Sequence, residues 1–326
     1  MADFENMSRV DSGSGDPVAG RVVYAPVKSV FLSAMCAAGL WGLWTCFRWD
    51  TVALFATKTV AVLLLGHSIG MHRRLIHKSF DCPKWLERVL VYFGVLVGLG
   101  GPFAMIRTHD MRDWAQRQPR CHDYFAHRRP PLVDAWWQMH CDLKLDRFPD
   151  LRIEPEVADD PFYRFIDRHW IAVHLPWAII FWLIGGWDWA AWGVCAQVAV
   201  TVTGHWLIGW FAHQQHTDDW QVRGAGVQGR NVPLTGWLTM GEGWHNNHHA
   251  FPGSAQIGLY RSQADPGYWL IKGLEAAGLA WNIRLPENLA WRPQLHWSSE
   301  GRPVRLPERK PCRIMGLIGR LGGTRI

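Results

Sequence analysis

The residues with the clearest chemical potential are three histidines in the segment 241–252, which reads GEGWHNNHHAFP. His245, His248 and His249 stand at i, i+3 and i+4, so on a helix all three side chains point from one face. Imidazole is a good ligand for iron, zinc and copper, and three clustered imidazoles can fill most of a metal ion's coordination shell. The alternative is a histidine-rich surface turn that binds nothing. The remaining histidines decide between the two.

Two weaker pairs precede this segment. His72 and His77 are five residues apart, which is roughly 140° around an α-helix, so their side chains should diverge and suit two metal ions better than one. His109 and Asp113 stand at i and i+4 and share a helical face, and a carboxylate beside an imidazole suits a redox-active iron. The alternatives are ordinary interfacial histidines for the first pair and an Asp–Arg surface network for the second.

A third pair ends a long apolar run. His205 and His213 are eight residues apart and therefore lie on roughly one helical face, two turns from each other. An ionisable residue inside a membrane helix is a functional candidate because its burial is costly. His205 could instead be a packing residue, whereas His213, at the end of the run, is the stronger candidate.

Composition indicates the kind of protein that must position these residues. The 326 residues include 22 Trp, a residue favoured at membrane interfaces, and several long runs carry no charge. The net charge of +6 agrees with the excess of Lys and Arg in cytoplasmic segments of membrane proteins. Because the basic residues are spread out and match no binding motif, we expect no nucleic-acid partner. The seven cysteines include no CxxC pair and are expected to be reduced.

Four apolar runs approach the length of about 20 residues that a membrane helix needs. The connection between the first and second runs is very short, and so is the connection between the third and fourth. These short connections predict two antiparallel hairpins. A further uncharged run at 89–106 contains four Gly and Pro102, so we expect a surface or re-entrant segment there. An even number of crossings then separates the histidine motifs, which places them on one side. We predict helices at about residues 27–47, 51–71, 170–187 and 189–213.

The distribution of basic residues predicts orientation. Lys and Arg are concentrated at 71–88 and 107–168 and are almost absent from the hairpin connections. Positive-inside bias therefore places both termini and the histidine motifs in the cytoplasm. Arg outnumbers Lys 27 to 7, an association with bacteria of high GC content, so we expect a bacterial inner membrane. We assign residues 1–24 to a disordered polar tail, 25–300 to the membrane domain and 301–326 to a basic C-terminal tail.

The order and spacing of the motifs resemble the membrane fatty-acyl desaturases, most closely the acyl-CoA desaturase branch, from about residue 28 to 282. The matching motifs are His72-x4-His77, the Ala212-His213 pair and the segment 242–252. The resemblance implies an all-α integral membrane protein, with four transmembrane helices in two hairpins and a cytosolic helical cap that holds a di-metal site of two iron ions. It also implies O2-dependent removal of two hydrogens from a fatty acyl chain, with electrons from a separate ferredoxin- or cytochrome-type protein.

The middle motif departs from the family pattern. The family has His-x-x-His-His, whereas Arg112 and Asp113 stand at the last two positions here. Arg112 cannot ligate a metal, and Asp113 could replace the last histidine with a carboxylate. Gly209 also stands where the acyl-CoA branch usually has an Asn near the metals. The ligand set carried over by the resemblance, with Asp113 added, is His72, His77, His109, Asp113, His213, His245, His248 and His249. Additional ligands or supporting residues could be His67, His122, His205, His216, Glu242 and Asn246.

Three functions compete on these observations. The leading hypothesis is a desaturase that introduces a double bond into a fatty acyl chain, carried by acyl-CoA or another acyl lipid. A lipid hydroxylase on the same metal centre would differ in product mass, because it adds an oxygen instead of removing two hydrogens. A non-catalytic lipid-binding membrane protein is the third hypothesis, and Arg112 is its main support.

Overall fold

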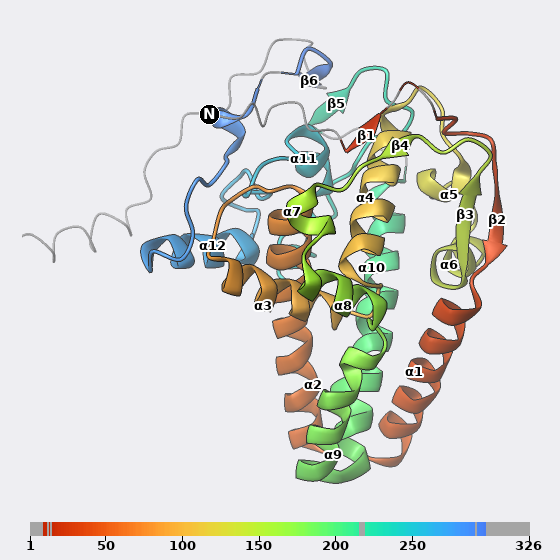
Figure 1. Cartoon of the computed structure of the whole chain (residues 1–326), viewed down its shortest axis with the longest axis vertical. Coiled ribbons are helices and arrows are strands. Elements are labelled where there is room, and N and C mark those ends of the chain that lie inside the picture. The colour runs from red at the N-terminus through yellow and green to blue at the C-terminus, as the bar shows by residue number, and fades with distance from the viewer. Residues whose placement is uncertain (1–8, 12, 14, 215–218, 291, 298–326) are drawn as a thin grey trace, which may run out of the picture.

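The computed structural model describes residues 9–297 apart from 12, 14, 215–218 and 291. A narrow stem of long helices lies below a wider head (Figure 1). The chain enters the stem by one helix, returns by a second, and passes through it again after building much of the head. The stem elements are α1 (Pro26–Thr45), α2 (Trp49–Ala61) continuing as η2 (Val62–Ile76), α9 (Leu175–Ala190), and η4 (Ala191–Ala196) continuing as α10 (Gln197–Ala212).

Three helical segments among the described residues are long and apolar enough to cross a membrane, namely Pro26–Thr45, Trp49–Ile76 and Ala172–Ala212. The third has 41 residues but is not straight, because Gly185 and Gly186 have non-helical backbone angles and Gly186 has a φ of 69°. Phe181 packs against Gly193, which a straight helix would hold about 18 Å away. The chain therefore reverses at the two glycines and forms two antiparallel arms.

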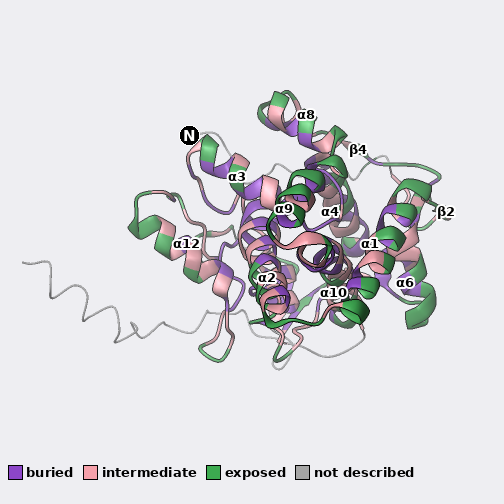
Figure 2. Cartoon of the chain, turned by 90° about the horizontal axis from the view of Figure 1, so that it is seen from below, coloured by how far each residue is buried: buried purple, intermediate pink, exposed green. Residues whose placement is uncertain are grey.

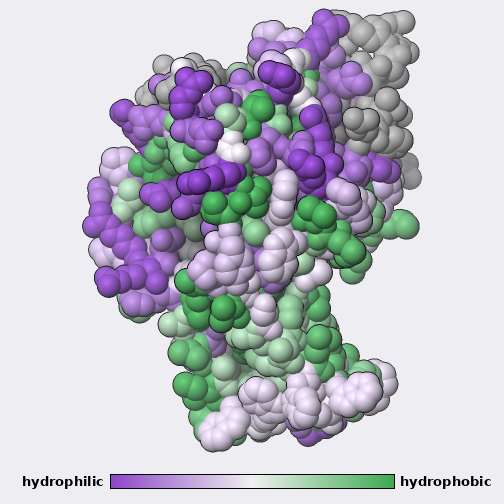
Figure 3. Space-filling view, turned by 90° about the vertical axis from the view of Figure 1, so that its right-hand side faces the viewer, coloured by the Kyte–Doolittle hydropathy of each residue, from purple (hydrophilic) through white to green (hydrophobic). Residues whose placement is uncertain are grey.

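Small residues let the stem helices approach closely. Gly39 and Gly42 of α1 lie against Ala196 and Ala191 of η4, a type of contact common between membrane helices. Seen along the stem, α1 and α9 carry exposed residues on their outer faces (Figure 2). In the space-filling view the narrow stem is largely hydrophobic (Figure 3). Exposed tryptophans concentrate toward its far end: Trp41, Trp44, Trp49, Trp182 and Trp187.

The two short connections of the stem meet at this far end. Trp189 Nε1 donates to Asp50 Oδ2 at 2.8 Å, and the Arg48 guanidinium lies 3.9 Å from Asp188. Both connections therefore turn at the same level. A belt of aromatic side chains with polar groups beside it is typical of a membrane–water interface.

The run at 89–106 does not form one continuous helix. Helix α3 (Lys84–Val95) ends within the first half of this run, and α4 (Pro102–Arg117) begins after a turn. The turn is bonded to α10, since Gln197 Nε2 donates to Leu96 O at 3.2 Å. Gln197 Oε1 also accepts from the buried Lys58 ammonium at 2.8 Å, which gives this charged group in the last turn of α2 a hydrogen-bond partner.

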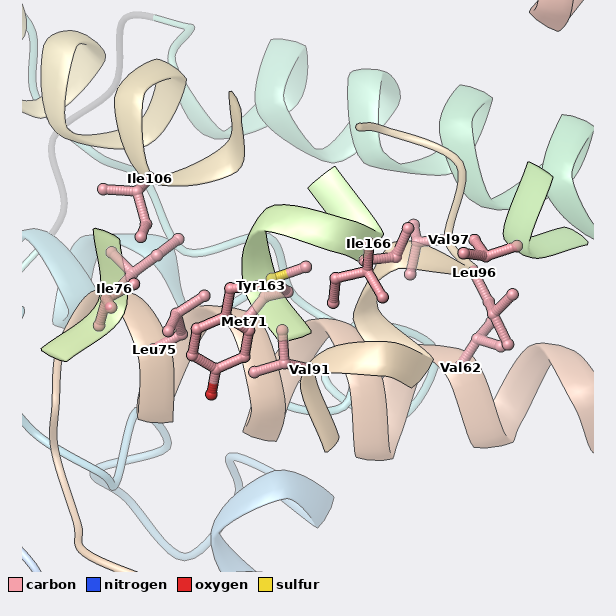
Figure 4. Close-up of a cluster of buried hydrophobic side chains, with 13 residues drawn as sticks. Val62, Met71, Leu75, Ile76, Val91, Leu96, Val97, Ile106, Tyr163 and Ile166 are labelled. Carbon is pink, nitrogen blue, oxygen red and sulfur yellow. The ribbon is translucent and has the colours of Figure 1, made fainter. Parts of the chain in front are cut away.

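The main core of the head lies where η2, α3, α4 and α8 (Pro161–Arg168) meet. Met71, Val91, Ile106 and Tyr163 represent these four elements in Figure 4 and are fully buried or nearly so. The remaining helices are short: α5 (Asp123–Ala126), α6 (Pro131–His140), α7 (Pro155–Ala158), η3 (Ala172–His174), α11 (His245–Ala250), α12 (Pro266–Ala276) and η5 (Pro286–Asn288).

The described residues also contain three antiparallel strand pairs. The fold is therefore mostly helical, whereas an all-α protein was predicted. The pairs are β1 (Val10–Asp11) with β4 (Asp150–Leu151), β2 (Gly20–Tyr24) with β3 (Cys141–Leu145), and β5 (Trp220–Val222) with β6 (Leu295–Trp297).

Residues 1–8, 12 and 14 of the predicted disordered tail fall outside the described residues, whereas the described part of 9–24 includes β1 and β2. Strand β2 pairs along its whole length with β3, and Arg9 inserts between the head elements. The Arg9 guanidinium lies 3.0 Å from both Asp110 and Glu154 and donates to the carbonyl of Ile76 at 2.9 Å. Polar composition misled the prediction because ion pairs and strand pairing order these residues, while Val10, alone among the described residues of this segment, packs as a buried side chain in the core cluster with Met111 and Trp114.

Replacing Arg9 with alanine should destabilise the protein by about 3 kcal/mol, because the Asp110 and Glu154 carboxylates would lose a buried partner. Thermal unfolding in detergent measures this as a lower Tm. Arg152→Ala is the matched control, since its ion pair with Asp150 is exposed to solvent and should contribute little. Equal Tm values for the two variants would contradict the structural role of Arg9.

Candidate metal centre

Seven of the predicted histidines form two adjacent groups in the head. The first group contains His72, His77, His109 and His248, and the second contains His213, His245 and His249. Within each group the ring nitrogens available to a metal lie within 4.8 Å of one another. The structure therefore brings together, within one group, residues that are as far apart in sequence as 72 and 248.

The first group depends on an unusual helix. His72 and His77 were expected to diverge, but their ring centroids are 4.7 Å apart and both side chains belong to one group. That expectation assumed an α-helix, whereas η2 is a π-helix, in which hydrogen bonds span five residues. The His77 N–H donates to His72 O at 3.0 Å, so residues five apart lie nearly one above the other. His109 comes from α4, with its ring 4.7 Å from that of His77.

The second group lies where the end of α10 meets α11. The Nε2 atom of His245 is 3.2 Å from that of His213 and 3.1 Å from that of His249. His213 directly follows α10, and its Nδ1 donates to Gly209 O at 2.6 Å, which leaves Nε2 directed at the group.

Helix α11 contributes histidines to both groups. Its three histidines lie close together, but His248 belongs to the first group while His245 and His249 belong to the second. The segment before it needs glycine for two reasons. Gly241 has a φ of 102°, a conformation that side chains disfavour, and a Cβ on Gly243 would lie 2.0 Å from Thr235 Oγ1.

Burial keeps most of these imidazoles neutral. It lowers the pKa of His77, His245 and His248 well below the usual value, and that of His249 to about 4. A neutral imidazole has a lone pair free for a metal at pH 7. His109 differs, because burial alone would lower its pKa but the Asp113 and Asp110 carboxylates outweigh it and raise the pKa.

Carboxylates lie against two histidines of the first group, His72 and His109. Glu242 Oε2 lies 2.6 Å from His72 Nδ1, and Glu242 Oε1 accepts from Ser68 Oγ at 2.6 Å. The His109 Nδ1 lies 3.1 Å from Asp110, the residue that Arg9 also contacts. A carboxylate on the outer nitrogen of an imidazole is the usual way to orient a metal-ligating histidine.

Asp113 lies near both groups, close to His109 of the first and beside His249 of the second, but is part of neither. Its Oδ2 accepts from Arg117 at 2.9 Å, and together with His249, Arg117 and Arg292 it lines a small cavity. Burial would raise the pKa of Asp113, but His109 and Arg117 outweigh it and hold the carboxyl ionised. Arg112, the other departure in the middle motif, donates to Gln138 Oε1 at 3.1 Å.

The other predicted residues have different surroundings. The His67 ring is stacked on that of His72, with ring centroids 6.5 Å apart, and its centroid lies 5.0 Å from that of His205. His67 and His205 therefore lie beside the first group without belonging to it. His122 accepts from Tyr124 N at 3.1 Å and caps α5. Asn246 is buried and bonds to the backbone of Trp220. His216 falls outside the described residues.

Sequence reasoning missed several contributors. Ser68 and Arg73 reach Glu242, and His127 stacks on His213. Arg73 stands inside the His72-x4-His77 motif but at an unspecified position, and Ser68 and His127 stand in no motif. His127 could have been flagged only as a further histidine near the atypical middle motif.

The donor set fits a pair of redox-active metal ions. Buried nitrogen donors with oriented rings, and carboxylates nearby to offset positive charge, suit iron. His77 Nε2 is buried and has no hydrogen-bond partner among the described residues, as expected for an atom reserved for a metal.

Comparison with known proteins agrees with the site. A family model for fatty acid desaturases matches residues 49–261. The sn-1 stearoyl-lipid 9-desaturase of Anabaena variabilis is 31% identical over 255 residues, covering 74% of this chain and 86% of that protein. The sn-2 palmitoyl-lipid 9-desaturase of Nostoc sp. (strain 36) is 30% identical over 263 residues, covering 78% and 88%. The acyl-CoA C20 Delta5-desaturase of Anemone leveillei is 29% identical over 252 residues, covering 76% and 75%.

Proposed function

Because the chain belongs to the fatty acid desaturase family and is an oxidoreductase that desaturates acyl chains, we propose that each histidine group binds one iron ion. The observation that carries this proposal is the pair of adjacent histidine groups, whose side chains are buried or partly buried. The relatives are named as desaturases, which does not favour the hydroxylase or the non-catalytic alternative.

The chain's own residues would bind and orient. His72, His77, His109 and His248 would hold one ion, and His213, His245 and His249 the other. Two irons bound there would supply the O2-dependent oxidation that side-chain acids and bases cannot perform. His72, His213 and His248 are buried, and Glu242 and Asp110 would fix the His72 and His109 rings.

The reaction needs a source of electrons. Reducing O2 to two water molecules takes four electrons and four protons, and removing two hydrogens from the acyl chain supplies half of each. A separate ferredoxin- or cytochrome-type protein would supply the other two electrons, and solvent the other two protons. The substrate is a fatty acyl lipid or acyl-CoA, which are the substrate classes named for the relatives.

The membrane arrangement is part of the proposal. We expect α1, α2–η2, α9 and η4–α10 to cross the bilayer as four helices, with the head and both termini on the cytoplasmic side of a bacterial inner membrane. The meeting of both stem connections at the end opposite the head supports this topology. Reporter fusions at residue 47 and at the C-terminus should report opposite sides, and the same side for both would contradict it.

Expression in a host that lacks unsaturated lipids tests the function. Lipid mass spectrometry should show acyl chains that have lost two hydrogens, with a double bond at one defined position. A product heavier by one oxygen would point to hydroxylation instead. An unchanged lipid profile from folded, iron-loaded protein with an active electron donor would count against desaturation.

Replacing Asp113 with alanine should weaken binding of the second iron by about 10- to 100-fold, because we propose that its carboxylate serves the second group as a ligand. Metal titration of the purified protein measures this. Asp123→Ala is the control, since this half-exposed carboxylate pairs with Arg129 on the surface. Full iron content at wild-type affinity in Asp113→Ala would remove Asp113 from the ligand set.

A further inference from the structure

The two histidine groups are unequal, because the second holds three nitrogen donors where the first holds four. We propose that His127 supplies the missing nitrogen donor to the second metal ion. This inference rests on the proposed function, in which that group binds iron. It is carried by the position, orientation and lack of a partner of the His127 ring.

His127 is held against the second group by its backbone. It directly follows α5 with φ 51° and ψ 37°, a left-handed conformation that few residues other than glycine adopt. Its ring is 2% exposed and lies parallel to that of His213, with centroids 5.1 Å apart and planes 13° apart. A Cβ on Gly209 would be 3.5 Å from both Cε1 and Nε2 of this ring. The imidazole therefore fills the space that a side chain at position 209 would occupy.

The orientation of the ring is fixed by a buried carboxylate. His127 Nδ1 lies 2.9 Å from Asp134 Oδ2, which also accepts from Trp206 Nε1 at 2.9 Å. With its proton on Nδ1, the ring presents the lone pair of Nε2. Metal-ligating histidines are commonly held in this way. His213 follows the same pattern, since its Nδ1 bonds to Gly209 O and its Nε2 is left for the group.

The Nε2 atom of His127 has no hydrogen-bond partner among the described residues. A buried polar atom without a partner costs about 1–3 kcal/mol, which a bound metal ion would offset. His174 is also buried with unpartnered nitrogens, but its ring lies against Phe31 in the stem. Lack of a partner is therefore informative only together with the position beside His213. Among the described residues of the second group, His127 contacts His213 alone, and its Nε2 would join the group when the metal binds.

The test measures iron per chain in folded, purified protein. The wild type should hold two irons, and His127→Gln should hold one. The matched control His174→Gln removes an equally buried imidazole and should keep two. Asp134→Asn keeps the His127 ring and the side-chain volume but weakens the orienting contact, so the second iron should bind about 10- to 100-fold more weakly.

A swap provides a second readout. In His127→Ala with Gly209→Asn, the new amide would occupy the space of the lost ring and should restore part of the second iron. Two irons bound at wild-type affinity in His127→Gln would overturn this inference but leave the proposed function standing. If that variant does not fold, wild-type affinity in Asp134→Asn would overturn it. A wild-type chain that holds fewer than two irons would overturn the proposed function as well.

Discussion

Replacing His248 with alanine should reduce desaturation on the order of 1000-fold, equivalent to about 4 kcal/mol of transition-state stabilisation. The side chain is 3% exposed, and its ring lies 4.5 Å from that of His72 and 4.8 Å from that of His77. Its loss would remove one of four nitrogens from the first group. It would also remove a ring that contacts the second group, because the His248 ring lies 5.5 Å from that of His245.

Double-bond formation in whole cells and iron content of the purified protein both measure this effect. We expect the iron content to fall along with the activity. His169→Ala is the control, since this exposed histidine at the end of α8 should affect neither quantity. An active His248→Ala protein with two irons would exclude His248 as a ligand.

The second large effect is expected at Gly70, where the backbones of η2 and α3 touch. A Cβ on Gly70 would lie 2.4 Å from the carbonyl oxygen of Leu90, a separation that no packed structure tolerates. Gly70→Ala should therefore force η2 away from α3 and destabilise the protein by about 3 kcal/mol. Since His72 lies on η2 and His77 directly follows it, the same displacement should reduce iron binding.

The matched control is Gly204→Ala in α10, where a Cβ would meet nothing within 4 Å. Alanine is the better helix former, so this substitution should leave Tm unchanged or slightly raised. Thermal unfolding in detergent and iron analysis compare the two. Equal Tm values for Gly70→Ala and the wild type would show that η2 and α3 can separate without cost.

The apolar spans and the third motif could be predicted because their signals are local. Spans were expected at about residues 27–47 and 51–71, and the structure has long apolar helices at Pro26–Thr45 and Trp49–Ile76. The i, i+3, i+4 spacing of the third motif predicted a histidine cluster, and α11 presents one. It did not predict that the three side chains would divide between two groups, because that depends on where η2 and α10 lie.

Other features depend on contacts that no local pattern records. The divergence expected for His72 and His77 was wrong because residue spacing does not distinguish a π-helix from an α-helix. The order of the N-terminal segment comes from Arg9 meeting Asp110 and Glu154, which are more than a hundred residues away in sequence. His127 lies beside His213 because of a left-handed turn after α5. Each of these follows from tertiary structure.

The proposed metal ligands are far apart in the sequence, and this affects the stability of the folded protein. The first group joins η2, α4 and α11, so an ion bound there would cross-link residues 77, 109 and 248 and close two long loops. Such a link removes conformational entropy from the unfolded chain, as a disulfide does. Iron supply would then control the lifetime of the protein as well as its activity. A chain made under iron starvation should open at the head first and be degraded sooner, while the stem helices stay in the membrane.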